Sequence, residues 1–343
     1  MTFTHRIATV LTALAMVVVS APAAAGHIDS IVFFGDSLSD TGNVWYATGG
    51  PSGGFPPPPY NQGSGGAGPD FTGGQWSDPL GPSWPTVFAA RFGLFATPSL
   101  VGGNNYAWGG ARTGTNPNFP ASGGVAYLDQ QVGLYGLSIA SGGPAPTAHT
   151  LASVVIGGND VANNLGNADA VTAGISSLTT QLSSLYGLGV RQFLVANVPD
   201  IGATPRFQEL GEDTAAFATA WTAVWNDALA AALDTLVLPG ADLYFLDFFS
   251  FGRNPEVLAG FANTTDACLT STVCDDPASY FYWDSFHPSS TAHALIARQA
   301  FAAVPEPGTI ALLMLGFAGL ALCTRGRQGR RATVSRASSG RHR

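Results

Sequence analysis

Positive charge is scarce in this chain. Between Gly26 and Ala303 there are 6 arginines, no lysine and 21 acidic residues, which gives this part a net charge of −15. The whole chain carries only −8, because half of its arginines follow Cys323. A body this acidic repels phosphate backbones, so its composition excludes nucleic acid as a partner.

Cysteine is almost as rare, with three residues in a chain of 343. Cys268 and Cys274 flank a five-residue loop, and in an exported protein we predict that they form a small disulfide loop. Two cysteines without a nearby histidine pair do not make a zinc site, so the sequence predicts no metal centre. Cys323 falls in an apolar stretch near the C-terminus and says nothing about the fold.

The N-terminal end has the pattern of a secretory signal. His5 and Arg6 precede an apolar run from Ile7 to Val19, and small residues follow up to Ala23-Ala24-Ala25. This order of charged, apolar and small-residue regions predicts a signal peptide over residues 1–25, cleaved near Ala25. The alternative is an uncleaved membrane anchor, which the shortness of the apolar run disfavours.

The C-terminal end, residues 304–343, is also a signal by its pattern. Val304-Pro305-Glu306-Pro307-Gly308-Thr309 leads into an uncharged stretch, Ile310 to Cys323, and then into an arginine-rich tail. As a helix, that stretch would be about 21 Å long, short for a hydrocarbon core of about 30 Å, so we expect transient membrane association. The arginines would hold the tail on the cytoplasmic side.

Motif, apolar stretch and basic tail together resemble the PEP-CTERM sorting signal of Gram-negative bacteria. The resemblance implies that an exosortase-type enzyme cuts near Pro-Glu-Pro and releases the body or re-anchors it at the surface. The expected location is therefore extracellular, or on the cell surface and outer envelope.

The body between these signals, residues 26–303, is long enough for one large domain. Apolar β-rich runs predict strands at 30–35, 152–156, 190–198 and 243–246, and the patterns between them predict helices near 84–92, 169–186, 213–236 and 289–301. A Gly/Pro-rich stretch from 48 to about 82 predicts a long loop. Buried strands that alternate with helices favour a three-layer α/β/α sandwich with a mainly parallel sheet. The helix over 213–236 should bury one face, made of Phe217, Trp221, Val224, Trp225, Leu229 and Leu236.

A candidate nucleophile follows the first strand directly, in Gly35-Asp36-Ser37-Leu38-Ser39-Asp40-Thr41-Gly42-Asn43. Ligands of open α/β sheets bind beyond the carboxyl ends of strands, so Ser37 would stand where a reactive hydroxyl is useful. The alternative is that Asp36 or Ser37 only caps a helix.

A serine nucleophile needs a base, and His287 is the best candidate among six histidines. Asp284 precedes it by three residues, so one tight loop can place this carboxylate against the imidazole. Pro288 would begin the last helix and hold the loop rigidly. His293 lies inside that helix, where we expect a packing or surface role.

Two segments could supply donors for an oxyanion. Gly102 to Thr113 contains glycines that let a backbone N–H approach a substrate, and Val155 to Asp160 places the Asn159 amide after a buried strand. The alternatives are an ordinary Gly-Gly turn and an Asn-Asp helix cap.

Taken together, the order Ser, Gly, Asn and Asp-x-x-His resembles the SGNH hydrolase superfamily and closely its GDSL lipase/esterase branch. G-D-S-L-S-D-T-G-N and N-Y-A-W-G-G-A-R-T carry this resemblance. It implies a flavodoxin-like sandwich without metal or organic cofactor. It also implies Ser37 as nucleophile, His287 as base and acid, Asp284 as its orienting carboxylate, and an oxyanion hole of Ser37 N–H, Gly110 N–H and the Asn159 side chain.

The implied function is hydrolysis of carboxylic esters through an acyl-enzyme. Lipid, short-chain and acetylated polysaccharide esters all remain open as substrates, and acyl transfer to an alcohol is a close variant. A second hypothesis is a surface adhesion or matrix protein that keeps the fold without the activity. The insertion Gly49 to Gly68 is peculiar to this chain, so it makes any substrate preference carried over from the family uncertain.

Overall fold

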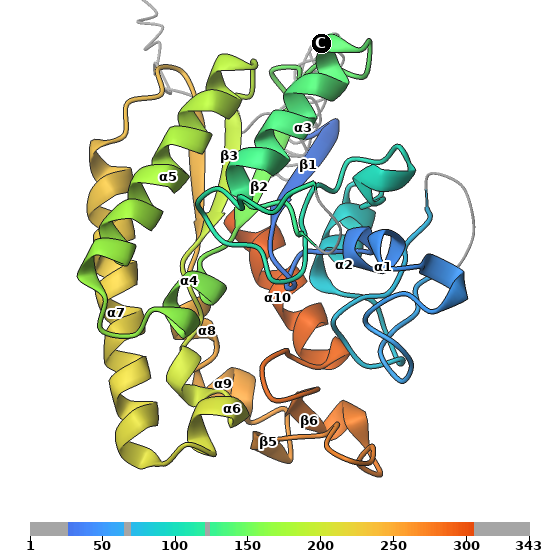
Figure 1. Cartoon of the computed structure of the whole chain (residues 1–343), viewed down its shortest axis with the longest axis vertical. Helices are drawn as coiled ribbons and strands as arrows, with labels where there is room; N and C mark the ends of the chain where they lie inside the picture. The colour runs from blue at the N-terminus through green and yellow to red at the C-terminus, as the bar shows by residue number, and fades with distance from the viewer. Residues whose placement is uncertain (1–26, 65–69, 121–123, 305–343) are drawn as a thin grey trace, which may run out of the picture. The chain divides into compact units, whose positions relative to one another are not determined.

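The computed structural model describes residues 27–64, 70–120 and 124–304 (Figure 1). The predicted signal peptide and all of the predicted sorting signal except Val304 lie outside these residues. Within the described part, no helix is long and apolar enough to cross a bilayer. The stretch Ile310 to Cys323, for which we expect membrane association, is not among the described residues.

A parallel sheet forms the centre of the body. Its strands are β1 (Ser30–Gly35), β2 (Thr150–Val155), β3 (Gln192–Ala196) and β4 (Asp242–Leu246), paired in that order. Ile31 lies opposite Leu151, which in turn faces Gln192. The four predicted strands are confirmed to within two residues at each end. Crossovers through helices keep all strands parallel, so their carboxyl ends share one edge.

The segment Asn104 to Trp108 runs along the free edge of β1. Phe33 donates its N–H to the carbonyl of Asn104 (3.0 Å), and Tyr106 donates back to Phe33 (2.8 Å). Trp108 then donates to the carbonyl of Gly35 at 3.1 Å. This pairing delivers the Gly109-Gly110 turn to the carboxyl end of β1, where Ser37 follows.

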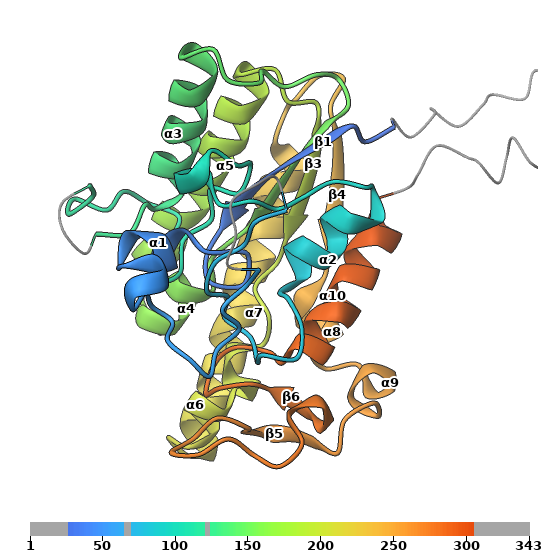
Figure 2. The ribbon, with the colours of Figure 1, turned by 90° about the vertical axis from the view of Figure 1, so that its right-hand side faces the viewer.

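Helices cover both faces of the sheet (Figure 2). One layer consists of α3 (Leu128–Ala140), α5 (Ala168–Gly187) and α7 (Glu212–Thr235), and the other of α2 (Trp84–Arg91), α8 (Phe248–Phe251) and α10 (Ser290–Ala303). A hydrophobic core lies between the sheet and each helix layer, and alternate residues of β1 pack into the two cores. Val32 and Phe34 face the first layer, whereas Ile31 and Phe33 face the second. Each fully buried large side chain contributes about 1.5–3 kcal/mol, so this alternation fixes the register of β1. The structure therefore confirms the three-layer α/β/α sandwich.

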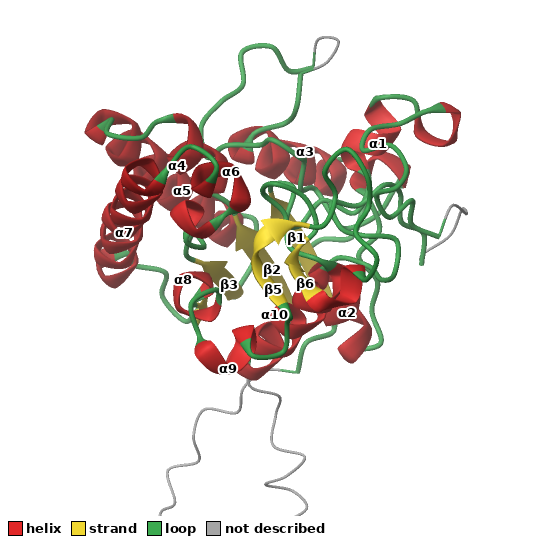
Figure 3. Ribbon diagram, turned by 90° about the horizontal axis from the view of Figure 1, so that it is seen from below, coloured by secondary structure: helices red, strands yellow, loops and turns green. Residues whose placement is uncertain are grey.

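Shorter elements lie at the carboxyl edge of the sheet and in the long connections. These are α1 (Asn43–Ala47), α4 (Gly158–Asn163), α6 (Pro205–Gln208), α9 (Pro255–Leu258), β5 (Asn263–Ala267), β6 (Tyr280–Tyr282) and the 3-10 turns η1 (Gly50–Ser52), η2 (Ser99–Val101), η3 (Ile201–Ala203) and η4 (Pro277–Ser279). β5 and β6 form a separate parallel pair beyond the carboxyl ends of the main strands (Figures 1 and 3). A disulfide joins Cys268 and Cys274, just after β5.

The predicted buried face of α7 is partly wrong. Phe217 and Val224 are 49% and 44% exposed, although Trp225 and Leu229 are buried. The buried side chains of α7 are Ala215, Ala218, Thr222, Trp225 and Leu229. Small residues occupy most of this stripe because the helix packs closely there, and the larger apolar side chains fall to its margins. The start of α10 also differs from the prediction, since the helix begins at Ser290, after a cap at Ser289.

Candidate active site

Ser37 lies in a tight turn between β1 and α1. Ser39 and Asp40 donate their N–H groups to the carbonyl of Asp36 (3.0 and 2.9 Å), and Leu38 donates to its carboxylate at 3.0 Å. A Cβ on Gly35 would lie 2.2 Å from the carbonyl oxygen of Val155, so only glycine allows the chain to turn this close to β2. Neither Asp36 nor Ser37 caps a helix, because α1 begins only at Asn43.

The imidazole of His287 lies between Ser37 and Asp284. Its Nε2 is 2.7 Å from Ser37 Oγ, and its Nδ1 is 2.7 Å from Asp284 Oδ2. Phe286 and His287 donate their backbone N–H groups to Asp284 Oδ1 at 2.7 and 2.6 Å. This loop of backbone donors fixes the carboxylate so that its second oxygen points at the ring, as the D-x-x-H spacing predicts.

Asp284 is charged in the folded protein. Burial alone would raise its pKa, but the positive charge of His287 and hydrogen bonds from His287 and Tyr60 lower it to about 2. The carboxylate therefore keeps its negative charge down to strongly acidic pH.

Asp40 connects the nucleophile turn to the glycine turn. Its buried carboxylate accepts the N–H groups of Gly42 (2.8 Å) and Asn43 (2.7 Å), and it accepts that of Gly109 at 2.9 Å. Burial raises the pKa of this carboxyl, while the same backbone donors lower it. Gly110 follows with φ of +80°, a conformation that favours glycine, and a Cβ there would meet no neighbour within 4 Å. The space beside Gly110 is therefore open, while the backbone just before it is held by the hydrogen bond from Gly109 to Asp40.

The segment after β2 holds the other side of this glycine turn. Asn159 donates from Nδ2 to the carbonyl of Ala111 at 3.0 Å, which leaves one amide hydrogen for another acceptor. Asp160 accepts the N–H of Thr113 at 3.1 Å and its hydroxyl at 2.8 Å. Burial raises the pKa of Asp160 to about 6, against the hydrogen bonds from Thr113. Gly110 and Asn159 are thus brought to the same edge of the sheet as Ser37.

Asp36 is a second buried carboxyl beside the turn. Burial raises its pKa to about 7, although the hydrogen bond from Leu38 and the charge of His287 oppose this. In the unfolded chain, the pKa of this carboxyl is near 3.8. Between these two values the folded state holds a proton that the unfolded state has lost, so the free energy of unfolding falls as pH rises from about 4 to 7.

We expect Asp36→Asn to remove this loss of stability, because asparagine keeps an acceptor for Leu38 and carries no charge. Urea unfolding between pH 4 and 8 should show equal stability at pH 4 and a gain of up to about 4 kcal/mol in the variant above pH 7. The exposed Asp275→Asn variant serves as the control. Parallel pH profiles for Asp36→Asn and the parent protein would contradict this expectation.

Two aromatic residues contact the candidate triad without having been assigned a role there from the sequence. Tyr60 donates its hydroxyl to Asp284 Oδ2 at 2.7 Å, and the Trp76 ring packs on the His287 ring with centroids 5.0 Å apart. Trp76 also fills the space beside Gly109, where a Cβ would lie 2.4 Å from the indole. Trp76 therefore packs between the glycine turn and the candidate base.

An apolar cavity of about 60 Å³ opens beside Ser37. The nucleophile turn, Gly158 and the loops that follow β3 and β4 surround it, with Phe248, Phe251, Phe281, Phe286 and Ile296 among its lining residues. Because the walls are mostly aromatic and aliphatic, the cavity suits a small apolar group.

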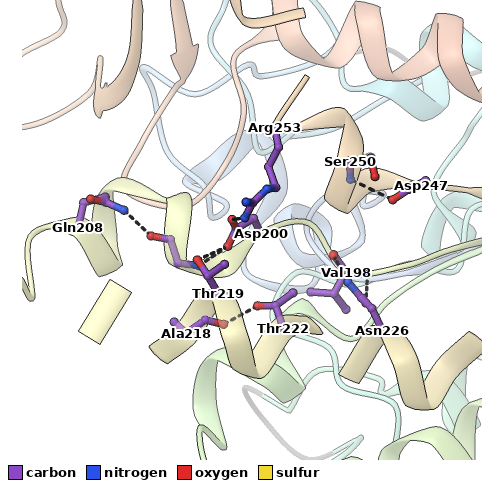
Figure 4. A network of polar contacts seen from close by, with 11 residues as sticks. Val198, Asp200, Gln208, Ala218, Thr219, Thr222, Asn226, Asp247, Ser250 and Arg253 are labelled. Atoms are coloured by element: carbon purple, nitrogen blue, oxygen red, sulfur yellow. Dashed lines mark hydrogen bonds and ion pairs between the residues drawn. The ribbon is translucent and has the colours of Figure 1, made fainter. Parts of the chain in front are cut away.

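A polar network supports the outer wall of this cavity (Figure 4). Asp200 accepts from the Thr219 hydroxyl (2.7 Å) and from the N–H of Gly202 (3.1 Å), and its other oxygen pairs with Arg253 at 2.7 Å. Arg253 is half exposed, so the ion pair contributes little stability by itself. The network instead fixes the loop after β3 against α7. Among the described residues, no three acidic, histidine or cysteine side chains gather as metal ligands.

Comparison with protein families gives two matches. A model of the GDSL-like lipase/acylhydrolase family matches residues 31–300, which is most of the chain. A model of the PEP-CTERM protein-sorting motif matches residues 303–328. The second motif indicates export and surface sorting in bacteria.

Similar proteins include plant enzymes and bacterial structures. The GDSL esterase/lipase At1g73610 of Arabidopsis thaliana is 30% identical over 128 residues, 34% of this chain and 37% of that protein. The GDSL esterase/lipase At2g19060 of the same plant is 28% identical over 248 residues, 62% and 70% of the two chains. Solved structures include the acetylxylan esterase Axe2 of Geobacillus stearothermophilus (TM-score 0.41, 16% identity, 82% of this chain and 96% of that chain) and phospholipase A1 of Streptomyces albidoflavus NA297 (TM-score 0.42, 16% identity, 82% and 100%). The chain thus spans only about two fifths of the length of the first curated relative.

Proposed function

Because the chain belongs to the GDSL-like lipase/acylhydrolase family, we propose that it is an exported serine hydrolase that cleaves carboxylic esters through an acyl-enzyme. The observation that carries this proposal is the 2.7 Å distance between His287 Nε2 and Ser37 Oγ, with Asp284 behind the ring. A serine hydroxyl is a weak nucleophile alone, and a base at this distance activates it.

In the proposed reaction, Ser37 Oγ attacks the ester carbonyl carbon while His287 takes the hydroxyl proton. The N–H groups of Ser37 and Gly110 and the amide of Asn159 stabilise the resulting oxyanion. His287 then gives its proton to the departing alcohol oxygen, which leaves an acyl group on Ser37. A water molecule, activated by the same ring, releases the acid and restores the serine.

The cavity beside Ser37 supports a short acyl group. Its volume is about 60 Å³ and its walls are mostly aromatic and aliphatic, so we infer that it takes short acyl chains in preference to long lipid chains. We expect kcat/KM for p-nitrophenyl esters to peak at acetate or butyrate and to fall at least about tenfold by octanoate. Phe251→Leu, which replaces a lining side chain by a smaller one, should move the optimum toward longer chains. A preference of the parent protein for octanoate or palmitate would contradict this assignment.

The main competing function is that of a surface matrix or adhesion protein that keeps the fold without catalysis; the sorting motif at 303–328 favours surface display. Labelling with a fluorophosphonate separates the two functions, because only an activated serine reacts. Folded protein that stays unlabelled would refute the hydrolase proposal. Adding an alcohol acceptor and analysing the products would distinguish hydrolysis from acyl transfer.

The PEP-CTERM match indicates export. The route of secretion and the processing of the C-terminal signal are part of the proposal. A signal peptide over residues 1–25 directs secretion, and an exosortase-type enzyme of a Gram-negative bacterium processes the chain near Pro305-Glu306-Pro307. The hydrolase body, residues 26–303, would then act in the outer envelope or outside the cell.

A further inference from the structure

The described part of the insertion, residues 49–64, contacts the candidate triad through Tyr60. Tyr60 is its only aromatic side chain that makes a hydrogen bond among the described residues, and the acceptor is Asp284 Oδ2 at 2.7 Å. That oxygen is the same one that faces His287 Nδ1. The two donors therefore share one carboxylate oxygen, and the backbone N–H groups of Phe286 and His287 occupy the other.

Tyr60 is held in place from both sides. Its ring packs edge-on against Trp76 and Trp283, with centroids 6.2 and 5.9 Å apart. The neighbouring Asn61 donates its N–H to Ser77 (2.9 Å) and accepts that of Gln75 (2.7 Å), so the backbone of the insertion pairs with the segment that carries Trp76. A hydroxyl on such a fixed ring reaches Asp284 without a large loss of side-chain entropy.

We propose that Tyr60 is a positioning residue of the active site, whose hydroxyl holds the Asp284 carboxylate and sets the pH range in which His287 acts as base. The proposal rests on the proposed function of Ser37 and His287. A hydroxyl donated to Oδ2 disperses the negative charge there and weakens its attraction for a proton on the ring. Burial and the charge of Asp284 both raise the pKa of Tyr60, so the hydroxyl stays a donor.

Other titratable groups also face this pair. Asp36 approaches from the turn after β1, and its pKa responds to the charge of His287. His293 approaches from α10, but burial lowers its pKa to about 3, so it stays neutral at working pH. Arg206 of α6 lies over the Phe286 ring, 5.7 Å from its centroid. Because Asp36 titrates near neutral pH, it can also change the pH profile of the rate. The titration of the His287 ring must therefore be measured directly.

The test is Tyr60→Phe, which removes the hydroxyl and keeps the ring packing. We expect kcat/KM for p-nitrophenyl butyrate at pH 7 to fall about 3- to 10-fold, with KM nearly unchanged, and the acid limb of its pH profile to move up by about half a pH unit or more. NMR should show the His287 ring titrating at higher pH by the same amount. Tyr46→Phe is the matched control, since Tyr46 is also half-buried and its hydroxyl makes no hydrogen bond within the described residues.

A lower rate without a shift in either pH measurement would overturn the proposal, because Tyr60 would then act only through packing. Unchanged rate and titration would overturn it as well. The NMR titration needs no turnover. If the parent protein hydrolyses no ester, the proposed function fails, and the shift of the His287 titration still decides the role of Tyr60.

Discussion

Ser37→Ala should lower kcat for p-nitrophenyl butyrate by a factor on the order of 10⁴–10⁶ and abolish fluorophosphonate labelling. The reason is chemical, since no other hydroxyl lies within hydrogen-bond distance of His287 Nε2 among the described residues. The fold should survive, because the turn is held by backbone bonds to the Asp36 carbonyl and not by the Ser37 side chain. Circular dichroism and the thermal midpoint would check this.

Ser39→Ala provides a matched control from the same turn. Ser39 is as buried as Ser37, and its Oγ makes no hydrogen bond within the described part of the chain. Removing an unpaired buried hydroxyl should leave stability equal or slightly higher and activity unchanged. If purified Ser37→Ala kept more than about 1% of the parent activity, the nucleophile would have to be another residue.

Asp284→Asn should lower kcat on the order of 10³–10⁴-fold with little change in KM. The carboxylate offers one oxygen to the backbone N–H groups of Phe286 and His287 and the other to the ring. An amide has only one oxygen, which those backbone donors would take. Its NH₂ group would then face Nδ1, and the ring would carry its proton on Nε2, where it cannot accept one from Ser37.

Steady-state kinetics and thermal unfolding of Asp284→Asn beside Asp275→Asn would separate this tautomer effect from a general loss of charge. Asp275 is exposed and lies nine positions before Asp284 in the chain. A loss of less than about tenfold would show that His287 works without a charged partner. The triad, and with it the mechanism of Tyr60, would then need revision.

The Gly/Pro-rich segment after α1 contributes two aromatic side chains to the surroundings of the candidate triad. Tyr60 contacts the candidate triad, and Phe55, which is half exposed, packs edge-on against Trp76 with centroids 5.3 Å apart. Trp76 in turn packs on His287. Phe55 and Tyr60 thus both reach the surroundings of the candidate base, one through Trp76 and the other through Asp284.

Local sequence patterns determined the order and type of most large elements. The strands and α5, α7 and α10 were predictable because a buried strand is apolar throughout and a helix repeats its apolar face every three to four residues. The motif after β1 also named Ser37, since ligands bind beyond the carboxyl ends of parallel strands, and the D-x-x-H spacing named Asp284 and His287. α3 was missed because Gly133 and Gly136 weaken the local preference for helix, and burial of Leu128, Gln131 and Val132 compensates.

Only the tertiary structure decided which side chains meet across long stretches of chain. Tyr60 and Asp284 are 224 positions apart, and nothing in a Pro/Gly-rich loop indicates where its tyrosine will dock. The buried face of α7 was misjudged for a related reason. The distance between a helix and the elements it packs against selects small or large side chains, and hydrophobic periodicity does not report that distance. Hydrophobic periodicity is a property of neighbours in sequence, whereas the partner of a side chain depends on how all layers pack at once.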